Sequence, residues 1–291
     1  MRYEGPIYRP PSEAASLLIQ ATVGCPHNRC TFCMVYKAGP RFRVREVAEI
    51  KEDLDAARAT YGPGVRTLFL PAGNTIAMPT AALAEVCRYA RTVFPALHRI
   101  TVYGSSAYIH RKGPAGLEQL AEAGLSRIHV GLESGDDEVL RRIRKGTTFE
   151  EQVTAGRWTR AAGIALSLYV ILGIGGVERT EAHAEATARA INAIEPDFVR
   201  LRTFVPKIRT PLLADIEAGR FEILGPHGVL RETDRLVAGI NAKTRLTSDH
   251  YTNYINLEGS LPADRDRLRR EIGAALKREE STFRPFFIGN Q

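Results

Sequence analysis

The chain has 291 residues, of which 44% are hydrophobic and 25% are charged, and its formal net charge at pH 7 is +7. A chain of this length and composition buries a sizeable core, which excludes a disordered protein and a small disulfide-dense secreted domain. No apolar run approaches the about eighteen residues of a membrane span, and the first residues lack the apolar core of a signal peptide. We therefore expect a cytoplasmic protein without a membrane partner.

The excess of basic residues is compatible with nucleic acid, an anionic small molecule or an acidic electron donor as a partner. No basic block is interleaved with aromatic residues, as a single-strand-binding surface requires, and the arginines are scattered over predicted helices. A solvated basic surface is the favoured interpretation, so nucleic acid is not expected as a partner.

The first predicted elements are a Pro-rich lead-in, an apolar strand over residues 16–22 and a loop with three of the four cysteines, Cys25, Cys30 and Cys33. Thiolates at such short spacings repel one another or oxidise unless a metal holds them, and three clustered thiols cannot all pair as disulfides. Two kinds of site stay open. A structural zinc ion needs a fourth ligand, but His27 sits inside the loop and Cys87 lies far along the chain. A [4Fe–4S] cluster on three thiolates instead keeps one iron open.

After an amphipathic helix over residues 45–61, strands and helices alternate along the chain. Strands are predicted at 67–70, 99–103, 127–132, 165–172 and 198–203, and helices at 80–93, 114–123, 137–162 and 180–194. Apolar strands that alternate with helices indicate a parallel sheet, in either an open doubly wound sheet or a full or partial barrel. In both architectures, binding loops follow the carboxyl ends of the strands.

The alternation ends near residue 206, where prolines, glycines and charged residues begin to dominate. The segment beyond it contains an irregular stretch over residues 248–254 and predicted helices at 229–240 and 263–280. We therefore divide the chain into a lead-in (1–15), a strand–helix domain (16–206) and a C-terminal extension (207–291).

Small or polar residues stand at the predicted strand ends. Gly73 and Asn74 are an ordinary turn pair. Glu133 directly follows an apolar strand, where its carboxylate can accept hydrogen bonds from two hydroxyl groups. Lys145 lies in the turn after residues 137–144, the first part of a predicted helix, where a cation suits the helix dipole. Tyr169 fits a core position on the fifth strand.

Two arginines, Arg200 and Arg202, alternate along the last strand and therefore point the same way. Because an unpaired buried arginine is costly, both must face water or the mouth of a barrel, and they are candidate substrate anchors. The fourth cysteine, Cys87, stands among apolar residues of a predicted helix and is expected to be a buried structural thiol.

The cysteine stretch resembles the cluster loop of the radical S-adenosylmethionine (SAM) superfamily, whose cysteines are commonly spaced three and two apart. The run Cys30-Thr31-Phe32-Cys33 matches the second half of that loop, including its aromatic residue, and the first gap is one residue longer. Residues 130–140 resemble the strand-to-helix junction of the branch that contains the oxygen-independent coproporphyrinogen oxidases and the methylthiotransferases. The resemblance implies a partial (βα)6 barrel with a short, mostly helical C-terminal extension.

The resemblance also implies two cofactors, a [4Fe–4S] cluster and SAM, and a role for each site residue. Three thiolates, Cys25, Cys30 and Cys33, would bind the cluster. The implied SAM contacts are Phe32 in the cluster loop, Gly73 and Asn74 for the methionine amino group, Glu133 and Tyr169 for the ribose, Lys145 for the methionine carboxylate and Ile174 for the adenine ring. No side chain is assigned as catalytic.

The implied function is reductive cleavage of SAM to methionine and a 5′-deoxyadenosyl radical that abstracts hydrogen from a substrate. The sequence shows no cobalamin domain, no cysteine pair for an auxiliary cluster and no obvious nucleic-acid-binding fold, which favours a small-molecule substrate. A flavodoxin or ferredoxin is the expected electron donor. The alternative from another class is a zinc-stabilised protein that binds nucleic acid or another anion without redox chemistry.

Overall fold

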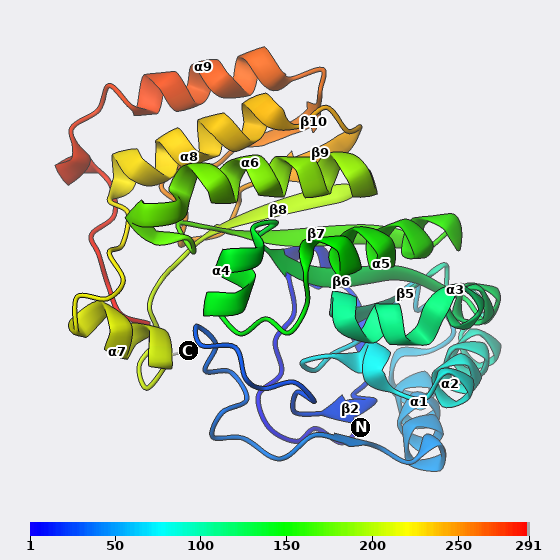
Figure 1. Cartoon of the computed structure of the whole chain (residues 1–291). Helices are drawn as coiled ribbons and strands as arrows, with labels where there is room; N and C mark the ends of the chain where they lie inside the picture. The colour runs from blue at the N-terminus through cyan, green and yellow to red at the C-terminus, as the bar shows by residue number, and fades with distance from the viewer. Residues whose placement is uncertain (290–291) are drawn as a thin grey trace. The chain divides into compact units, whose positions relative to one another are not determined.

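The computed structural model of the chain describes residues 1–289, which form two compact units that we describe one at a time (Figure 1). The first unit consists of Met1–Asn28, Val35–Val130 and Trp158–Leu166. The second unit consists of Arg29–Met34, Gly131–Arg157 and the chain from Ser167 onward. These units are defined by how compactly the residues pack, whereas the predicted division at residues 15 and 206 is defined by where the strand–helix alternation begins and ends. That division stays a prediction.

Parallel strands form the sheet of the first unit. Their order is β1 (Leu17–Leu18), β4 (Thr67–Leu70), β5 (Arg99–Gly104) and β6 (Leu125–Glu133), and the last residues of β6 belong to the second unit. The connections contain α1 (Val47–Tyr61), η2 (Thr75–Ala77), α2 (Thr80–Val93) and α3 (Ser106–Glu122). A separate hairpin pairs β2 (Thr22–Val23) with β3 (Arg43–Val44), so the predicted strand over residues 16–22 forms two short strands in different sheets.

Helix α3 begins earlier than the sequence predicts. It starts at Ser106 and bends at Gly113, whose φ of +66° is not helical. Proline favours the first turn of a helix, and Pro114 therefore opens the second segment of a bent helix rather than the helix itself.

The N-terminal lead-in ends in a 3-10 turn, η1 (Pro11–Glu13), that buries Glu13 completely. The Glu13 carboxylate accepts a hydrogen bond from Ser16 Oγ at 2.6 Å, and its oxygens lie 3.2 Å from Arg99 Nη2 and 3.3 Å from His129 Nε2. Because Arg99 and His129 belong to β5 and β6, this carboxylate fixes the lead-in to the sheet of its own unit.

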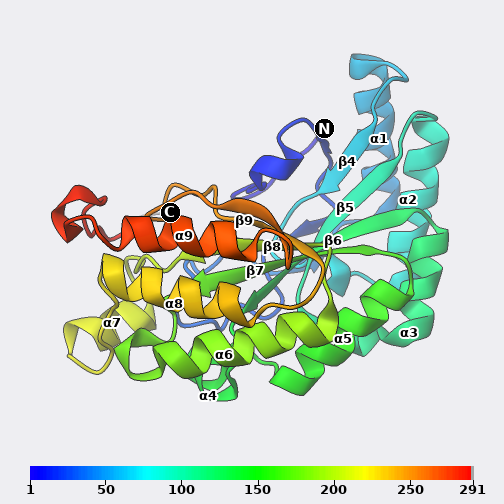
Figure 2. The same ribbon diagram turned by 90° about the horizontal axis from the view of Figure 1, so that it is seen from above.

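In the second unit, β7 (Ala165–Leu172), β8 (Phe198–Thr203) and β9 (Thr244–Thr247) run parallel, and β10 (Glu258–Leu261) is antiparallel to β9. The helical elements are α4 (Asp137–Arg142), α5 (Phe149–Ala161), α6 (Gly176–Ile194), α7 (Pro211–Glu217), α8 (Pro226–Gly239), α9 (Arg265–Ala275) and η3 (Glu280–Thr282). The end of α5 and the start of β7 belong to the first unit. Helices α6, α8 and α9 pack side by side along these strands (Figure 2).

Two features of the second unit differ from the sequence-based expectations. The helix predicted over residues 137–162 is broken between Arg142 and Phe149, because Arg144 and Gly146 have φ angles of +51° and +73°. The C-terminal extension contains the strands β9 and β10 in addition to its helices. Strand β9 was missed because its short run has one large apolar residue, Leu246, which is too weak a pattern to predict a strand.

No helix within residues 1–289 is both long enough and apolar enough to cross a membrane.

Candidate active site

The second half of the cysteine loop, Cys30–Cys33, is held by backbone hydrogen bonds within the second unit. Thr31 N donates to Ile143 O at 2.9 Å, just past the end of α4, and Leu212 N at the start of α7 donates to Thr31 O at 3.1 Å. Phe32 packs against the apolar cluster to which Ile143 and Leu212 belong. The two thiols are therefore fixed between the end of one helix and the start of another.

Beside these thiols, the broken helix presents Lys145 from the turn between α4 and α5. Its ammonium group lies 2.7 Å from Glu133 Oε1, and both side chains are about nine-tenths buried. Burial alone lowers the pKa of Lys145, but the charges of Glu133, Cys30 and Cys33 together raise it above the ordinary value. The lysine is therefore charged, with the carboxylate in contact and the two cysteines within range of its charge.

A glycine in β6 makes room for this pair. A Cβ atom at Gly131 would collide with Glu133 Oε1 and would lie 2.9 Å from Lys145 Nζ. Glu133 itself has a φ of +60°, which is uncommon for a residue with a side chain. Strained backbone of this kind is often retained at binding and catalytic sites.

The turn after Glu133 is anchored by buried hydrogen bonds. Ser134 Oγ and His183 Nδ1 are 2.8 Å apart, and His183 Nε2 lies 3.5 Å from Glu232 Oε1. Glu232 also accepts a hydrogen bond from Gly173 N at 2.6 Å, in the turn after β7. Sequence analysis missed His183 and Glu232, because residues this far apart along the chain form no local motif.

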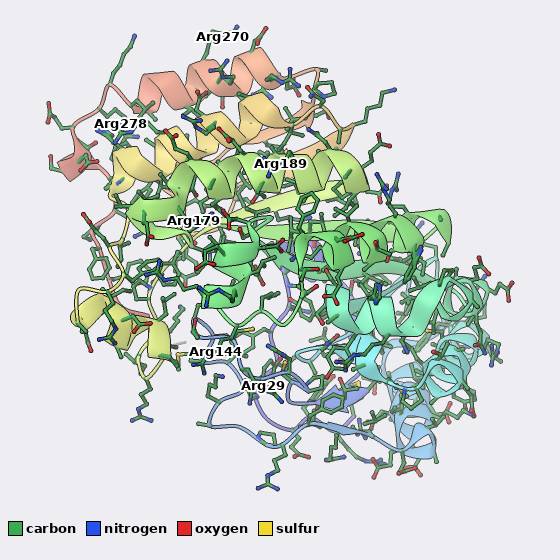
Figure 3. All side chains as sticks on the ribbon, viewed as in Figure 1. Arg29, Arg144, Arg179, Arg189, Arg270 and Arg278 are labelled. Carbon is green, nitrogen blue, oxygen red and sulfur yellow. The ribbon has the colours of Figure 1, made fainter. Side chains whose placement is uncertain are left out.

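Asp136 occupies the position before the first residue of α4 and caps that helix. Its side chain accepts hydrogen bonds from Glu138 N and Val139 N. The same carboxylate accepts from Arg179 Nη2 at 2.7 Å, so the start of α4 is tied to α6, and Figure 3 shows Arg179 among the side chains of this unit.

Two other predicted SAM contacts lie in the second unit. Ile174 is fully buried in the apolar cluster against which Phe32 packs. Tyr169, on β7, has the Arg202 guanidinium 5.9 Å from its ring centroid. Their contacts with adenine and ribose stay predictions.

In the first unit, the turn after β4 approaches the first cysteine. Gly73 N donates to Gly24 O at 3.1 Å, and a Cβ atom at Gly73 would lie 2.7 Å from the Cβ of Cys25. Only glycine allows this approach. The preceding residue, Ala72, has a φ of +123°, so the backbone is strained here as well.

Asn74 is 1% exposed, and its Nδ2 donates to Ser105 Oγ at 3.0 Å. Its Oδ1 atom is buried and has no hydrogen-bond partner among the described residues. An unsatisfied buried acceptor is costly, so this oxygen is suited to a donor supplied by a ligand.

Neither unit alone contains all three predicted cluster ligands, since Cys25 belongs to the first unit and Cys30 and Cys33 to the second. In the part of the chain that the structure describes, no three His, Cys, Asp or Glu side chains are grouped closely enough to hold a metal ion. None of the four cysteines forms a disulfide. Cys87 is buried in α2, and burial raises the pKa of its thiol to about 12, as suits a structural residue.

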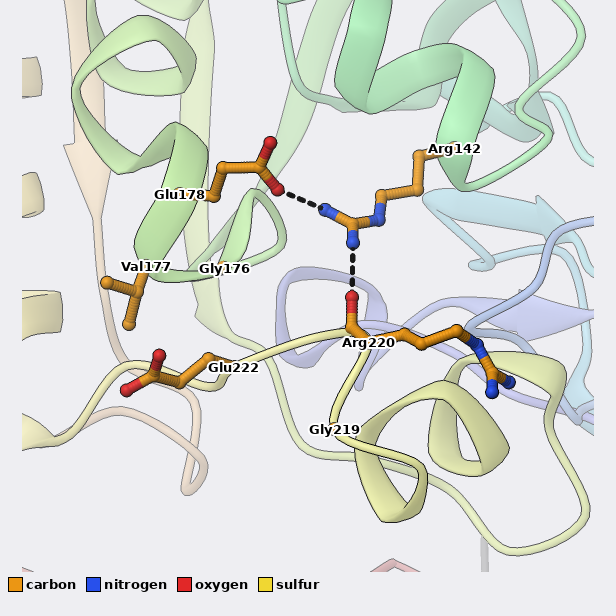
Figure 4. A pocket seen from close by; sticks show the side chains of 7 residues that line it. All are labelled: Arg142, Gly176, Val177, Glu178, Gly219, Arg220 and Glu222. Carbon is orange, nitrogen blue, oxygen red and sulfur yellow. Dashed lines mark hydrogen bonds and ion pairs between the residues drawn. The ribbon is translucent and has the colours of Figure 1, made fainter.

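A pocket of about 260 Å³ near the start of α6 is lined by other residues (Figure 4). Arg142 Nη1 lies 3.2 Å from Glu178 Oε2, and its Nη2 donates to Arg220 O at 2.6 Å. The Arg142 side chain is thus held by two groups of the lining, and none of the predicted SAM contacts lines this pocket.

Comparison with known families identifies the class of this protein. Residues 19–190, more than half of the chain, match the model of the Radical SAM superfamily, and the chain belongs to that superfamily. It is therefore an enzyme. Members of the superfamily bind a [4Fe–4S] cluster and SAM, so the predicted family and the cofactors that it implies are confirmed.

Curated relatives match over part of their length. The 3-methylornithine synthase of Methanosarcina barkeri (strain Fusaro / DSM 804) is 26% identical over 184 residues, which are 57% of this chain and 51% of that protein. The oxygen-independent coproporphyrinogen III oxidase of Paracoccus denitrificans (strain Pd 1222) is 27% identical over 253 residues, which are 83% of this chain and 54% of that protein. The chain thus spans about half the length of these relatives, and tRNA-2-methylthio-N(6)-dimethylallyladenosine synthases are also similar.

The solved structures agree on the fold. The crystal structure of methylornithine synthase aligns with a TM-score of 0.51 and 20% identity, covering 91% of this chain and 83% of that one. The α/β fold with a mostly parallel sheet, as in the partial barrels of radical SAM enzymes, is confirmed.

Proposed function

We propose that this chain uses a [4Fe–4S] cluster held by Cys25, Cys30 and Cys33 to cleave SAM reductively and activate a small-molecule substrate. When bound, the cluster and SAM supply a 5′-deoxyadenosyl radical, which abstracts a hydrogen atom from the substrate. The chain's own residues bind SAM, orient it and exclude water. Family membership does not favour the zinc-stabilised alternative.

The observation that carries this proposal is the arrangement of charges around Lys145. Its ammonium group is paired with Glu133 at 2.7 Å and interacts with the charges of Cys30 and Cys33. SAM has a carboxylate that suits the lysine and ribose hydroxyl groups that suit the glutamate. Two polar parts of one ligand thus have complementary partners beside two thiols.

The first unit supports the proposal independently. Asn74 Oδ1 is a buried acceptor without a hydrogen-bond donor among the described residues. The methionine ammonium group of SAM would supply that donor. The adjacent Gly73 brings this turn against Cys25. In this unit, the soft thiolate of Cys25 suits an iron–sulfur cluster, and the lone acceptor of Asn74 suits a ligand with an ammonium group.

The proposed electron donor is a flavodoxin or a ferredoxin of the cytoplasm. A net charge of +7 suits the docking of an acidic donor protein, because opposite charges speed the encounter of two proteins.

Cysteine replacement tests the metal centre. We expect the anaerobically reconstituted protein to hold about four iron atoms per chain, and Cys25→Ala, Cys30→Ala and Cys33→Ala each to lose them. Cys87→Ala is the matched control, because this buried thiol lies outside the loop and should retain the iron. Equal iron loss from Cys87→Ala would indicate a site with four protein ligands, and a colourless wild-type protein with one zinc ion would contradict the proposal.

A further inference from the structure

Strand β8 presents two arginines on its less buried face. Val199 and Leu201 are buried, whereas Arg200 and Arg202 alternate with them and keep contact with solvent. In the register of β7 and β8, Ile171 is the neighbour of Arg202. The side chain of Arg202 is exposed, as the sequence predicts for an arginine without a buried partner.

Lys207 and His250 stand close enough to Arg202 for their charges to interact. Burial is the main cause that lowers the pKa of Lys207, and the charge of Arg202 lowers it further, whereas Cys33 raises it. Burial and then Arg202 also lower the pKa of His250, to about 4. Two cations and an imidazole thus lie within range of one another's charge, and Lys207 is also within range of the charge of Cys33.

Within residues 1–289, no acidic side chain pairs with Arg202 or Lys207. Neither the Arg202 nor the Lys207 side chain forms an ion pair or a hydrogen bond with any residue that the structure describes. The carboxylate that acts on His250, Asp249, is exposed. Like charges repel one another, so an anion that binds between these two cations would be favoured.

The loop that carries His250 is fixed to both sides of Arg202. Asn253 Nδ2 donates to Leu201 O at 2.9 Å, and Asn253 Oδ1 accepts from Thr203 N at 2.7 Å. The Asn253 side chain thus binds the backbone on both sides of Arg202 and holds the loop beside this arginine.

The imidazole is oriented as a hydrogen-bond donor. Thr252 N donates to His250 Nδ1 at 3.3 Å, and Thr252 Oγ1 lies 2.7 Å from the same nitrogen. Because Nδ1 accepts a hydrogen bond, the proton of the neutral ring is on Nε2. All three side chains therefore offer N–H groups.

We propose that Arg202, Lys207 and His250 bind an oxyanion of the substrate, either a carboxylate or a phosphate group. This inference rests on the proposed function, since it assigns one end of the substrate to a place next to the loop that carries Cys33. A guanidinium group forms paired hydrogen bonds with an oxyanion, and an ammonium group adds charge. The substrate class is accordingly an anionic small molecule.

Calorimetric titration of the cluster-loaded protein with two probe anions, malonate and inorganic phosphate, tests this inference. SAM is present throughout, and sodium chloride keeps the ionic strength constant. We expect saturable binding of at least one anion, weakened roughly 10- to 100-fold by Arg202→Gln or by Lys207→Gln. Arg245→Gln is the matched control, because Arg245 is an exposed arginine that pairs with Glu258 on the next strand.

Tighter binding of malonate indicates a carboxylate substrate, and tighter binding of phosphate indicates a phosphorylated one. If neither anion binds saturably, or if Arg202→Gln and Lys207→Gln leave the affinity unchanged, the inference is wrong. Formation of 5′-deoxyadenosine by the same wild-type sample is measured in parallel. SAM cleavage without anion binding overturns this inference alone, whereas anion binding without SAM cleavage counts against the proposed function alone.

Discussion

Glu133 combines an unfavourable backbone conformation with a buried charge. A non-glycine residue in the left-handed region costs about 1–3 kcal/mol, and a buried ion pair contributes little net stability to compensate for it. If stability were the only requirement, an apolar residue or a glycine at this position would cost less free energy. This combination supports the proposal that a ligand uses Glu133 and its partner Lys145.

Single and double replacements of this pair separate binding from folding. Glu133→Gln and Lys145→Met are each expected to weaken SAM binding about 10- to 100-fold, because each removes a charge-assisted hydrogen bond. Each single variant also leaves a buried charge without its partner and should lower the melting temperature. The double variant removes both charges and should regain stability without regaining affinity, as equilibrium dialysis with SAM and thermal unfolding would show.

The matched control for this pair is Arg141→Gln. Arg141 pairs with Glu138 on the exposed side of α4, and an exposed pair contributes at most about 1 kcal/mol. Its loss should alter neither SAM binding nor the melting temperature. If the Lys145 variants unfold early yet bind SAM with unchanged affinity, the pair is structural and has no role in binding.

The space over β6 is a second target at the residue scale. Gly131→Ala places a methyl group where Glu133 Oε1 lies, so the pair must shift. We expect weaker SAM binding in the same assay, with a smaller effect from Gly163→Ala as the control, because nothing surrounds the Cβ position there. Both glycines are tested for melting temperature as well, since Gly163 has a φ of +75° and its replacement is strained for that reason alone. If Gly131→Ala binds SAM with unchanged affinity, the present position of the Glu133–Lys145 pair is not required for SAM binding.

At the scale of elements, Glu232 joins α8 to the turn after β7 and to α6. It accepts hydrogen bonds from Gly173 N and Thr180 Oγ1, both at 2.6 Å, and burial raises the pKa of its carboxyl group. Glu232→Ala leaves these two donors unsatisfied. We expect a loss of about 1–3 kcal/mol in the free energy of unfolding, measured by urea denaturation.

Glu185→Ala is the control for this replacement. Glu185 lies on α6 and pairs with Arg235, but both side chains are exposed, so the free energy of unfolding should change by no more than about 1 kcal/mol. Equal effects of the two replacements would contradict a structural role for the buried glutamate.

The sequence predicts elements well where the hydrophobic pattern is long and local. Strand β7 and helix α2 have the predicted bounds, because apolar residues recur at the right spacing throughout. The break before Lys145 was not predicted, since it depends on left-handed backbone at Arg144 as well as Gly146. Left-handed backbone at a residue with a side chain has no reliable sequence signal.

At the scale of the whole molecule, we expect protonation of Glu13 at low pH to lower the free energy of unfolding. Burial tends to raise the pKa of this carboxyl group, but hydrogen bonds from His129 and Ser16 and the charge of Arg99 lower it from 4.5 to about 2. A lowered folded-state pKa gives stability that is present above the unfolded-state pKa and is lost as the pH falls through the folded-state pKa. We therefore expect about 3 kcal/mol of the free energy of unfolding to be lost between pH 5 and pH 2.

Urea denaturation across this pH range measures the effect. Glu13→Gln cannot titrate, so its free energy of unfolding should fall less steeply below pH 5 than that of the wild-type protein. Glu258→Gln is the control, because Glu258 is exposed, and it should retain the wild-type pH dependence. If both variants follow the wild-type dependence of the free energy of unfolding on pH, Glu13 does not cause the loss of stability in acid.

The candidate site was predicted where its residues follow one another along the chain. The cysteine loop and the turns at Gly73 and Glu133 are local motifs next to predicted strands. Partners brought together only by folding, such as His183 and Glu232, had no sequence signal. The pairing of Glu133 with Lys145 was also not predicted, although each residue was singled out separately.

The central claim is that this chain cleaves SAM reductively. The most direct test is to incubate anaerobically reconstituted protein with dithionite and SAM, without substrate, and to measure 5′-deoxyadenosine by chromatography and mass spectrometry. The account predicts slow formation of 5′-deoxyadenosine that requires dithionite and is absent from Cys30→Ala. Cluster-loaded wild-type protein that binds SAM but forms no 5′-deoxyadenosine would contradict it.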